Sequence, residues 1–195
     1  MSHNPSPRRL IVGMSGASGA IYGIRILQAL QGSGIETHLV MSESARITLA
    51  AESELTASEV EALASQVHQV RNVGATLASG SFKTMGMVIA PCSIRTLSEV
   101  AWGGTSSLLT RAADVVLKER RRLVLMLRET PLHAGHLQSM LQVTNNGAIV
   151  MPPVPAFYAR PKTIDDIVNH SVGRVLDLFD IETDLVTRWA GLGKA

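Results

Sequence analysis

Residues Leu108 to His133 read LLTRAADVVLKERRRLVLMLRETPLH, and this stretch decides the fold. Its first half has apolar residues at helical spacing, while Arg111, Asp114 and Lys118 share one face and form a charged stripe. A basic turn follows, as is common where a helix ends, and then an unbroken apolar run over 123–127. A run of that length is typical of a strand buried on both faces, so the sequence predicts a helix that leads into a buried parallel strand.

Arg128 and Glu129 come directly after that strand. In open α/β sheets, ligands bind beyond the carboxyl ends of the strands, where this pair would meet an anionic ligand and supply a proton. A surface ion pair explains the same two residues equally well on pattern alone. Both interpretations stay open at this point.

The rest of the chain alternates between strand-like and helix-like segments. Short apolar runs predict strands, and longer segments with apolar residues at helical spacing predict helices. Further strands are expected at 9–13, 36–41, 85–90 and 147–151, and further helices at 20–31, 44–53, 58–67, 133–143, after 91–92 and from Thr163 onward. This order predicts an α/β fold with a doubly wound parallel sheet, a Rossmann-like or flavodoxin-like three-layer sandwich.

A glycine-rich turn, MSGASGA at 14–20, joins the first strand to the first helix. Backbone N–H groups at such a helix N-terminus receive phosphate, and Ser15 and Ser18 add hydroxyl donors, so phosphate binding is favoured over a plain tight turn. The glycines do not follow the G-x-G-x-x-G spacing of dinucleotide sites. The second strand ends at Ser42-Glu43, where dinucleotide folds usually place the acid that binds ribose, and this tilts against NAD without excluding it.

Composition narrows the class of protein. A chain of 195 residues that is 46% hydrophobic can bury one sizeable core, so we expect a single domain over 1–195 with a flexible start at 1–8. The net charge of +2, with basic residues scattered outside one cluster, argues against a nucleic-acid surface. No apolar run reaches membrane-spanning length. The lone Cys92 fits a reducing cytoplasm and is interpreted as a small buried residue rather than a nucleophile.

Three smaller features carry expectations of their own. Phe82 is an apolar residue in an otherwise polar loop and should either fill a crevice or belong to a lid. Ser93 should cap the helix that follows it. His133 and His136 could share one helix face, but a third ligand at suitable spacing is missing, so no metal site is expected.

Four motifs then carry a resemblance to a known family. In chain order they are MSGASGAIYG, APCS-x-x-T-L, RAADVVLKERRRLVLMLRE and PPVPAFY. With them the chain resembles the flavin prenyltransferase family, the UbiX-type flavoproteins, from Leu10 to Leu192. The resemblance implies an enzyme that joins the dimethylallyl group of dimethylallyl phosphate to N5 and C6 of reduced FMN. Its product, prenylated FMN, would serve a UbiD-type aromatic-acid decarboxylase.

The resemblance also implies roles for the residues at matching positions. FMN would be bound by Gly16, Ala17, Ser18, Ser42, Ser93, Ile94, Arg95, Thr96 and Arg128. Dimethylallyl phosphate would be bound by Arg111, Lys118, Glu129, Tyr158 and Arg174. The residues implied in catalysis are Ser18, Glu52, Lys118, Glu129 and Trp189.

The implied residue types suit the release of phosphate. Arg111, Lys118 and Arg174 would hold and stabilise the departing dianion without a metal, and Tyr158 would add a hydrogen bond.

The implied proton carriers are less distinct. Glu129 and Ser18 are candidates for proton transfer, and the released phosphate is a third. Trp189 would shelter an allylic cation with its aromatic face if it reaches the site. The sequence does not separate these proton carriers.

The chain departs from the family pattern at three places. Ser106-Ser107 replaces a usual Asn or Asp pair, Leu127 replaces a common Pro, and Gln138-Ser139 replaces a usual Glu-Asn. These departures remove no matched catalytic residue. They could change the geometry of the loops in which they lie and a contact between subunits. The resemblance implies a homododecamer with the flavin at subunit boundaries.

Three other functions compete with this one. An FMN-dependent oxidative cysteine decarboxylase would share the fold. Such enzymes use a His base early in the chain, and here the helix after MSGASGA contains no His. A flavin carrier subunit without chemistry of its own would bind FMN and would tolerate the loss of Lys118 and Glu129. Direct decarboxylation of an aromatic acid by this chain alone is a weaker third possibility.

Overall fold

The computed structural model describes residues 8–189 and 191, so all of the expected flexible start except Arg8 lies outside the described residues. Six parallel strands form one sheet in the order β3-β2-β1-β4-β5-β6. The strands are β1 (Arg9–Met14), β2 (Glu36–Met41), β3 (Gln66–His68), β4 (Gly86–Cys92), β5 (Arg122–Leu127) and β6 (Ile149–Val150). The predicted doubly wound parallel sheet is therefore confirmed.

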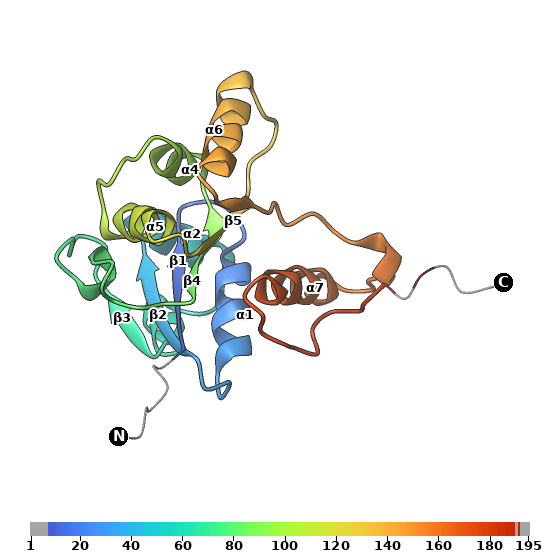
Figure 1. The fold of residues 1–195 in the computed structure, drawn as a ribbon. Helices are drawn as coiled ribbons and strands as arrows, with labels where there is room; N and C mark the ends of the chain where they lie inside the picture. The colour runs from blue at the N-terminus through green and yellow to red at the C-terminus, as the bar shows by residue number, and fades with distance from the viewer. Residues whose placement is uncertain (1–7, 190, 192–195) are drawn as a thin grey trace.

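Helices cover both faces of this sheet (Figure 1). One face carries α1 (Ala20–Leu30), α2 (Glu43–Glu52), α3 (Ala57–Glu61) and α7 (Ile164–Asp177). The other face carries α4 (Ile94–Ala101), α5 (Leu108–Lys118) and α6 (Ala134–Asn145). Within the described part of the chain, no helix has the length and apolar character needed to cross a membrane.

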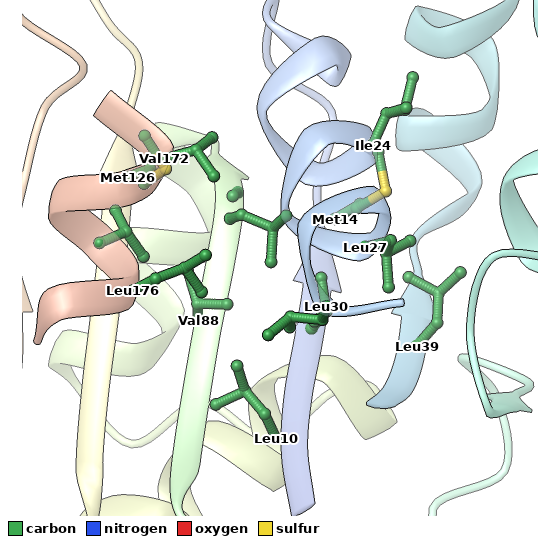
Figure 2. Close-up of a cluster of buried hydrophobic side chains, with 14 of the residues drawn as sticks. Leu10, Met14, Ile24, Leu27, Leu30, Leu39, Val88, Met126, Val172 and Leu176 are labelled. Atoms are coloured by element: carbon green, nitrogen blue, oxygen red, sulfur yellow. The ribbon is translucent and has the colours of Figure 1, made fainter. Parts of the chain in front are cut away.

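Two apolar cores lie between these layers. Figure 2 shows the first, in which side chains of β1, β2, β4 and β5 meet α1 and α7. The second lies under α5, where Leu109, Ala112, Ala113 and Val116 are buried against the opposite face of the sheet. These four residues have the helical spacing seen in the sequence, and β5 is buried throughout after its first residue, so the predicted helix and strand are both confirmed.

The strand order places a topological switch point between β1 and β4. From β1 the chain moves outward to β2 and β3, and from β4 it moves in the other direction to β5 and β6. Because the loops after β1 and β4 leave in opposite directions, a crevice opens outside the carboxyl ends of these strands, and ligands of such folds bind there.

One predicted element is wrong. The segment 58–67 was expected to be a helix because apolar residues recur at helical spacing, but α3 ends at Glu61 and β3 begins at Gln66. Pairing with β2 decides the outcome, because Leu39 and Val40 of β2 face Val67 and His68 of β3 in parallel register. Tertiary pairing of this kind overrides local propensity.

Phe82 fills a crevice instead of forming a lid. Its ring meets the ring of His38 edge-on, with 5.1 Å between the centroids, and the Arg9 guanidinium lies 4.7 Å from the centre of the Phe82 ring. His38 is fully buried in β2, and its Nδ1 lies 3.0 Å from Nε2 of His68. This cluster fixes the loop before β4 to the sheet.

We expect the apparent melting temperature to fall as the pH drops from about 7.5 to 5.5, and to fall less in a His38→Gln variant. Burial lowers the pKa of His38, and although Glu36 opposes this, the charges of His68 and Arg9 add to it. Because the pKa of His38 is lower in the folded protein than its unfolded value of about 6.5, neutral His38 stabilises the fold fully above that pH. This stabilisation is lost as the pH falls below the unfolded value toward the folded one. Thermal unfolding at several pH values measures the two slopes, and equal slopes would contradict the expectation.

Candidate functional site

A cavity of about 450 Å³ lies at the carboxyl ends of the central strands. Three helices begin at its wall, and each is capped by a serine, Ser42 for α2, Ser93 for α4 and Ser107 for α5. The lining residues are Ser42, Glu43, Ser44, Val70, Arg71, Ser93, Arg95, Thr96, Glu99, Ser106, Ser107, Leu109 and Thr110. Three helix N-termini directed at one cavity favour an anionic ligand, because each has free N–H groups and a partial positive charge.

The capping contacts show why these serines hold the helices in place. Ser42 Oγ accepts from the Ala45 N–H at 3.1 Å, and Ser93 Oγ accepts from the Thr96 N–H at 3.3 Å. The predicted cap at Ser93 is therefore confirmed. Ser107 Oγ accepts from the Thr110 N–H at 3.4 Å, so the Ser106-Ser107 departure from the family pattern keeps a working cap.

Two arginines at the cavity are held by carboxylates and remain largely exposed. Arg95 Nε lies 3.0 Å from Glu99 Oε1, and Ser106 Oγ donates to the other oxygen of Glu99 at 2.7 Å. Arg71 Nε lies 3.8 Å from Glu43 Oε1. Arg71, Glu99 and the capping role of Ser107 were not predicted from the sequence. The cap pattern before the helix could have revealed Ser107, whereas Arg71 reaches the cavity only through the unpredicted strand β3.

The glycine-rich turn packs through Gly16 against Ser44, one of the residues that line this cavity. A Cβ added at Gly16 would overlap the side chain of Ser44, so only glycine lets the turn lie this close to the start of α2. Ser15 was expected to donate to phosphate, and here the structure corrects the prediction. Its buried hydroxyl donates to the Pro91 carbonyl at 3.0 Å and accepts from the Ser93 N–H at 2.7 Å, which joins the ends of β1 and β4.

We expect Gly16→Ala to weaken FMN binding by about tenfold, because the new methyl group forces Ser44 toward the cavity. Gly74→Ala is the matched control, since its added Cβ would come no closer than 3.6 Å to the nearest atom, Asn72 Oδ1. Fluorescence titration with FMN measures both affinities. Equal affinities for the two variants would contradict the placement of FMN at this turn.

The N-terminus of α1 holds a carboxylate of the chain itself. Glu52 Oε2 accepts from the Gly19 N–H at 2.8 Å and from the Ala20 N–H at 3.2 Å. Glu52 therefore occupies the N-terminus of α1, where the sequence predicted phosphate, whereas α2, α4 and α5 begin at the cavity.

The pKa of Glu52 is lowered in this position. Partial burial raises it, but hydrogen bonds from Ser18, Gly19 and Ala20 and the positive charge of Arg128 together outweigh burial. Glu52 is therefore ionised at neutral pH. The same contacts bring Ser18, Glu52 and Arg128 together at the start of α1.

Arg128 and Glu129 directly follow β5 and therefore lie at the carboxyl ends of the strands, as the cavity does. The Arg128 N–H donates to the Cys92 carbonyl at 3.0 Å, which ties the end of β5 to the end of β4. The Thr130 N–H donates to Glu129 Oε1 at 3.0 Å. Cys92 itself is buried, as the sequence predicted, and burial raises the pKa of its thiol to about 12.

Lys118 and Glu129 lie at opposite ends of the strands: Lys118 lies near the amino end of β5, and Glu129 near its carboxyl end. It is the last residue of α5, whereas Glu129 follows the carboxyl end of β5, a strand of six residues that spans roughly 20 Å. Lys118 pairs with Glu119, and Arg111 pairs with Asp114 at 2.7 Å. The predicted charged stripe on α5 therefore exists, but it does not meet Glu129 within one chain.

A third group of predicted residues surrounds a separate cavity of about 370 Å³ beside α7. The Tyr158 hydroxyl lies 3.0 Å from His170 Nε2, and the Tyr158 ring meets the Trp189 ring edge-on at 5.5 Å between centroids. Arg174 Nη1 donates to Asp177 Oδ2 at 2.7 Å. Tyr158, Arg174 and Trp189 are thus brought together.

Asp177 also receives two hydrogen bonds from Arg188, of 2.9 and 3.1 Å. Arg188 is the main cause of the lowered pKa of Asp177, with Arg174 adding to it against partial burial. Asp177 is therefore a fixed counter-charge behind the Arg174 side chain.

The predicted site residues consequently form three groups in one chain. The first lies at the cavity and the turn, the second runs along α5, and the third lies beside α7 on the other face of the sheet (Figure 1). One chain holds the cavity at the switch point but separates Lys118 from Arg174 and Tyr158.

Comparison with known proteins agrees with this geometry. The family model described as Flavoprotein matches residues 1–176. The flavin prenyltransferase UbiX of Thauera aromatica is 63% identical over 183 residues, which cover 94% of each protein. A crystal structure of AnUbiX (PadA1) in complex with FMN and dimethylallyl pyrophosphate matches with a TM-score of 0.94 at 49% identity, and the match covers 96% of this chain and 100% of that one.

A second solved structure is similar to almost the same extent. It is a dodecameric FMN-dependent Ubix-like decarboxylase from Escherichia coli O157:H7, with a TM-score of 0.92 and 49% identity over 94% of this chain and 100% of that one. The sheet order, the cavity at the switch point and these relatives lead to one conclusion: the chain belongs to the UbiX family of flavin prenyltransferases.

Proposed function

We propose that this chain is a metal-independent prenyltransferase that joins the dimethylallyl group of dimethylallyl phosphate to reduced FMN. We propose further that the prenylated FMN serves a UbiD-type decarboxylase. The observation that carries the proposal is the cavity at the switch point, where three helix N-termini meet, in a chain of the UbiX family. The complex of AnUbiX with FMN and dimethylallyl pyrophosphate supports the same class of ligands here.

The residues of the cavity fit FMN. The N-termini of α2, α4 and α5 can hold a phosphate with backbone N–H groups, and Arg95 and Arg71 add positive charge at the rim. The absence of a side chain at Gly16 lets the turn approach Ser44, which lines the cavity. When bound, reduced FMN supplies the two nucleophilic positions, N5 and C6.

The cationic side chains of the chain bind and stabilise the departing phosphate. Arg111 and Lys118 extend from α5, and Arg174 extends from α7 beside the Tyr158 hydroxyl. Fixed positive charges and a hydrogen-bond donor stabilise a leaving dianion more strongly in a site that excludes water. These four residues can therefore carry out the step that a metal ion performs in other phosphate-releasing enzymes.

We propose that a complete site needs more than one copy of the chain. Lys118 lies at the end of α5 on one face of the sheet, and Arg174 and Tyr158 lie with α7 on the other face. Large apolar side chains are exposed around the third group, including Val154, Phe157 and Ile164, and they offer a surface for a second copy. The dodecameric relative supports the same assembly here, a homododecamer.

The carboxylates divide between two tasks. The lowered pKa of Glu52 keeps it ionised, and its bonds to Gly19 and Ala20 assign it to holding the turn beside the reaction centre. Glu129 and Ser18 remain our candidates for proton transfer, because both lie at the same edge of the sheet. We assign Trp189 to shelter positive charge on the allyl group from the side of Tyr158.

Two further points belong to this proposal. We place the protein in the cytoplasm, where the lone and buried Cys92 stays reduced. The basic residues on α5 and α7 can bind either a monophosphate or a diphosphate donor, and comparing the two donors in one assay distinguishes them.

A coupled assay tests the proposal against its alternatives. The protein is incubated without oxygen with reduced FMN and dimethylallyl phosphate, and the released flavin is added to a UbiD-type decarboxylase made without its cofactor. We expect carbon dioxide release only when the chain, reduced FMN and the allyl donor were all present in the first incubation.

Each control incubation corresponds to one alternative. Release after FMN alone would favour a flavin carrier. Release of carbon dioxide from an aromatic acid without the second protein would favour direct decarboxylation. In a separate incubation with oxidised FMN as the electron acceptor, oxidative decarboxylation of a peptide with a C-terminal cysteine would favour the cysteine decarboxylase, an enzyme for which α1 offers no His base.

A further inference from the structure

A short loop before β4, residues 79–82, is built against the end of α5. Gly80 faces the pair formed by Glu119 and Lys118, so closely that an added Cβ would overlap Glu119 Oε1 and come within 2.9 Å of Lys118 Nζ. The loop therefore forms one wall of the space in which the Lys118 ammonium lies. Lys118 is otherwise a flexible side chain that is about half exposed.

Arg121 fixes this loop to α5. Its Nη1 donates to the Phe82 carbonyl at 2.7 Å, and its Nη2 donates to the Gly80 carbonyl at 2.6 Å. The Arg121 side chain is only 17% exposed, so both bonds are shielded from water. A guanidinium that bridges two carbonyls in this way holds the backbone between them in one conformation.

The other side of the loop is fixed by the Phe82 ring. The ring packs against buried His38 and under the Arg9 guanidinium, as described above. The loop is thus held between the sheet and α5, and it cannot move away from Lys118 without breaking one of these contacts.

Glu119 completes the arrangement. It pairs with Lys118, and its other oxygen lies 4.0 Å from Arg121 Nη2. The hydrogen bond and the charge of Lys118 lower the pKa of Glu119, so the carboxylate stays ionised at neutral pH. An ammonium has three N–H donors, and Glu119 occupies one of them, which leaves two for a phosphate.

We propose that Arg121 and the loop 79–82 are positioning elements that hold the Glu119–Lys118 pair in place for the phosphate of the allyl donor. Arg121 does not contact the substrate and acts only by holding the Glu119–Lys118 pair in place. The proposal rests on the proposed function, in which Lys118 binds that phosphate. Its physical basis is that a side chain held in one place loses less conformational freedom when it binds the ligand.

Two variants and a control test this proposal. Arg121→Met removes both bonds to the loop, and Gly80→Ala displaces only the far ends of Glu119 and Lys118, so it leaves the fold intact. Arg122→Met is the control, because it removes the same charge one residue away, where Arg122 pairs with Asp180. The affinity of dimethylallyl phosphate is measured on the complex with oxidised FMN, in which no transfer occurs.

We expect both test variants to bind dimethylallyl phosphate about tenfold to a hundredfold more weakly, as displacement of a binding group by about 1 Å would cause. FMN affinity and the melting temperature of Gly80→Ala should stay at wild-type values, as should donor affinity in Arg122→Met. Donor affinity within twofold of wild type in both test variants would overturn the proposal.

A second comparison separates positioning from general damage. In a Lys118→Met background, adding Arg121→Met should weaken donor binding no further, because Arg121 acts through Lys118. An equal loss in both backgrounds would overturn the positioning role. If wild-type protein neither binds the donor nor prenylates reduced FMN, the proposed function itself fails, and that result is distinct from both outcomes.

Discussion

Lys118→Met and Glu129→Gln should each lower the rate of prenyl transfer by about 10²- to 10³-fold, while FMN binding stays at the wild-type level. Lys118 supplies a positive charge to the leaving phosphate, and Glu129 supplies a proton-transfer group at the end of β5. Neither side chain lines the cavity assigned to the FMN phosphate, which explains why FMN should be retained. Single-turnover measurements with reduced FMN give the transfer rate directly.

Lys162→Met is the matched control for the lysine variant. Lys162 is exposed and precedes α7, and its replacement removes the same charge far from α5. It should transfer the prenyl group at the wild-type rate. Full activity in Lys118→Met and Glu129→Gln would contradict the assignment and would favour a flavin carrier, since a carrier needs neither residue.

The second large effect is recovery of activity when two inactive variants are mixed in one oligomer. Lys118→Met and Arg174→Met should each be nearly inactive alone. When the two are expressed together with different affinity tags and purified through both, about a quarter of the sites should carry both wild-type residues, because each site takes them from different copies. The mixed oligomer should then show about a quarter of the wild-type activity per site.

The structural reason is the separation of α5 and α7 by the sheet. A mixture of Lys118→Met with a Lys118→Met, Arg174→Met double variant is the control, since no site in it can hold a wild-type lysine. Recovery in the first mixture and none in the second would place the two residues in different copies. No recovery in either mixture would contradict a site built between copies.

The sequence predicted the fold well where periodicity and caps act locally. Helical spacing in α5 and the apolar run of β5 gave both elements, and the acid-rich start of α7 follows a capping box at Thr163, as the residue types suggest. β3 could not be predicted, because it is only three residues long and depends on an unpaired edge of β2. A strand stabilised by pairing alone carries little local signal.

The site could be predicted in part for the same reason. Ser93 was found because it precedes a helix and Ser42 because it ends a strand, whereas the bonds from Glu52 to Gly19 and Ala20 join positions more than 30 residues apart. Arg121 was interpreted as part of a solvated basic turn, and only the structure reveals its bonds to Gly80 and Phe82. The division of the site residues between two faces of the sheet likewise depends on topology.

Mass analysis of the released flavin tests whether this chain prenylates reduced FMN. Purified protein is incubated without oxygen with reduced FMN and dimethylallyl phosphate, and the released flavin is analysed by mass spectrometry. We expect a flavin heavier by one five-carbon unit, formed by wild-type protein and not by Lys118→Met. FMN of unchanged mass, bound by the protein but never modified, would contradict it.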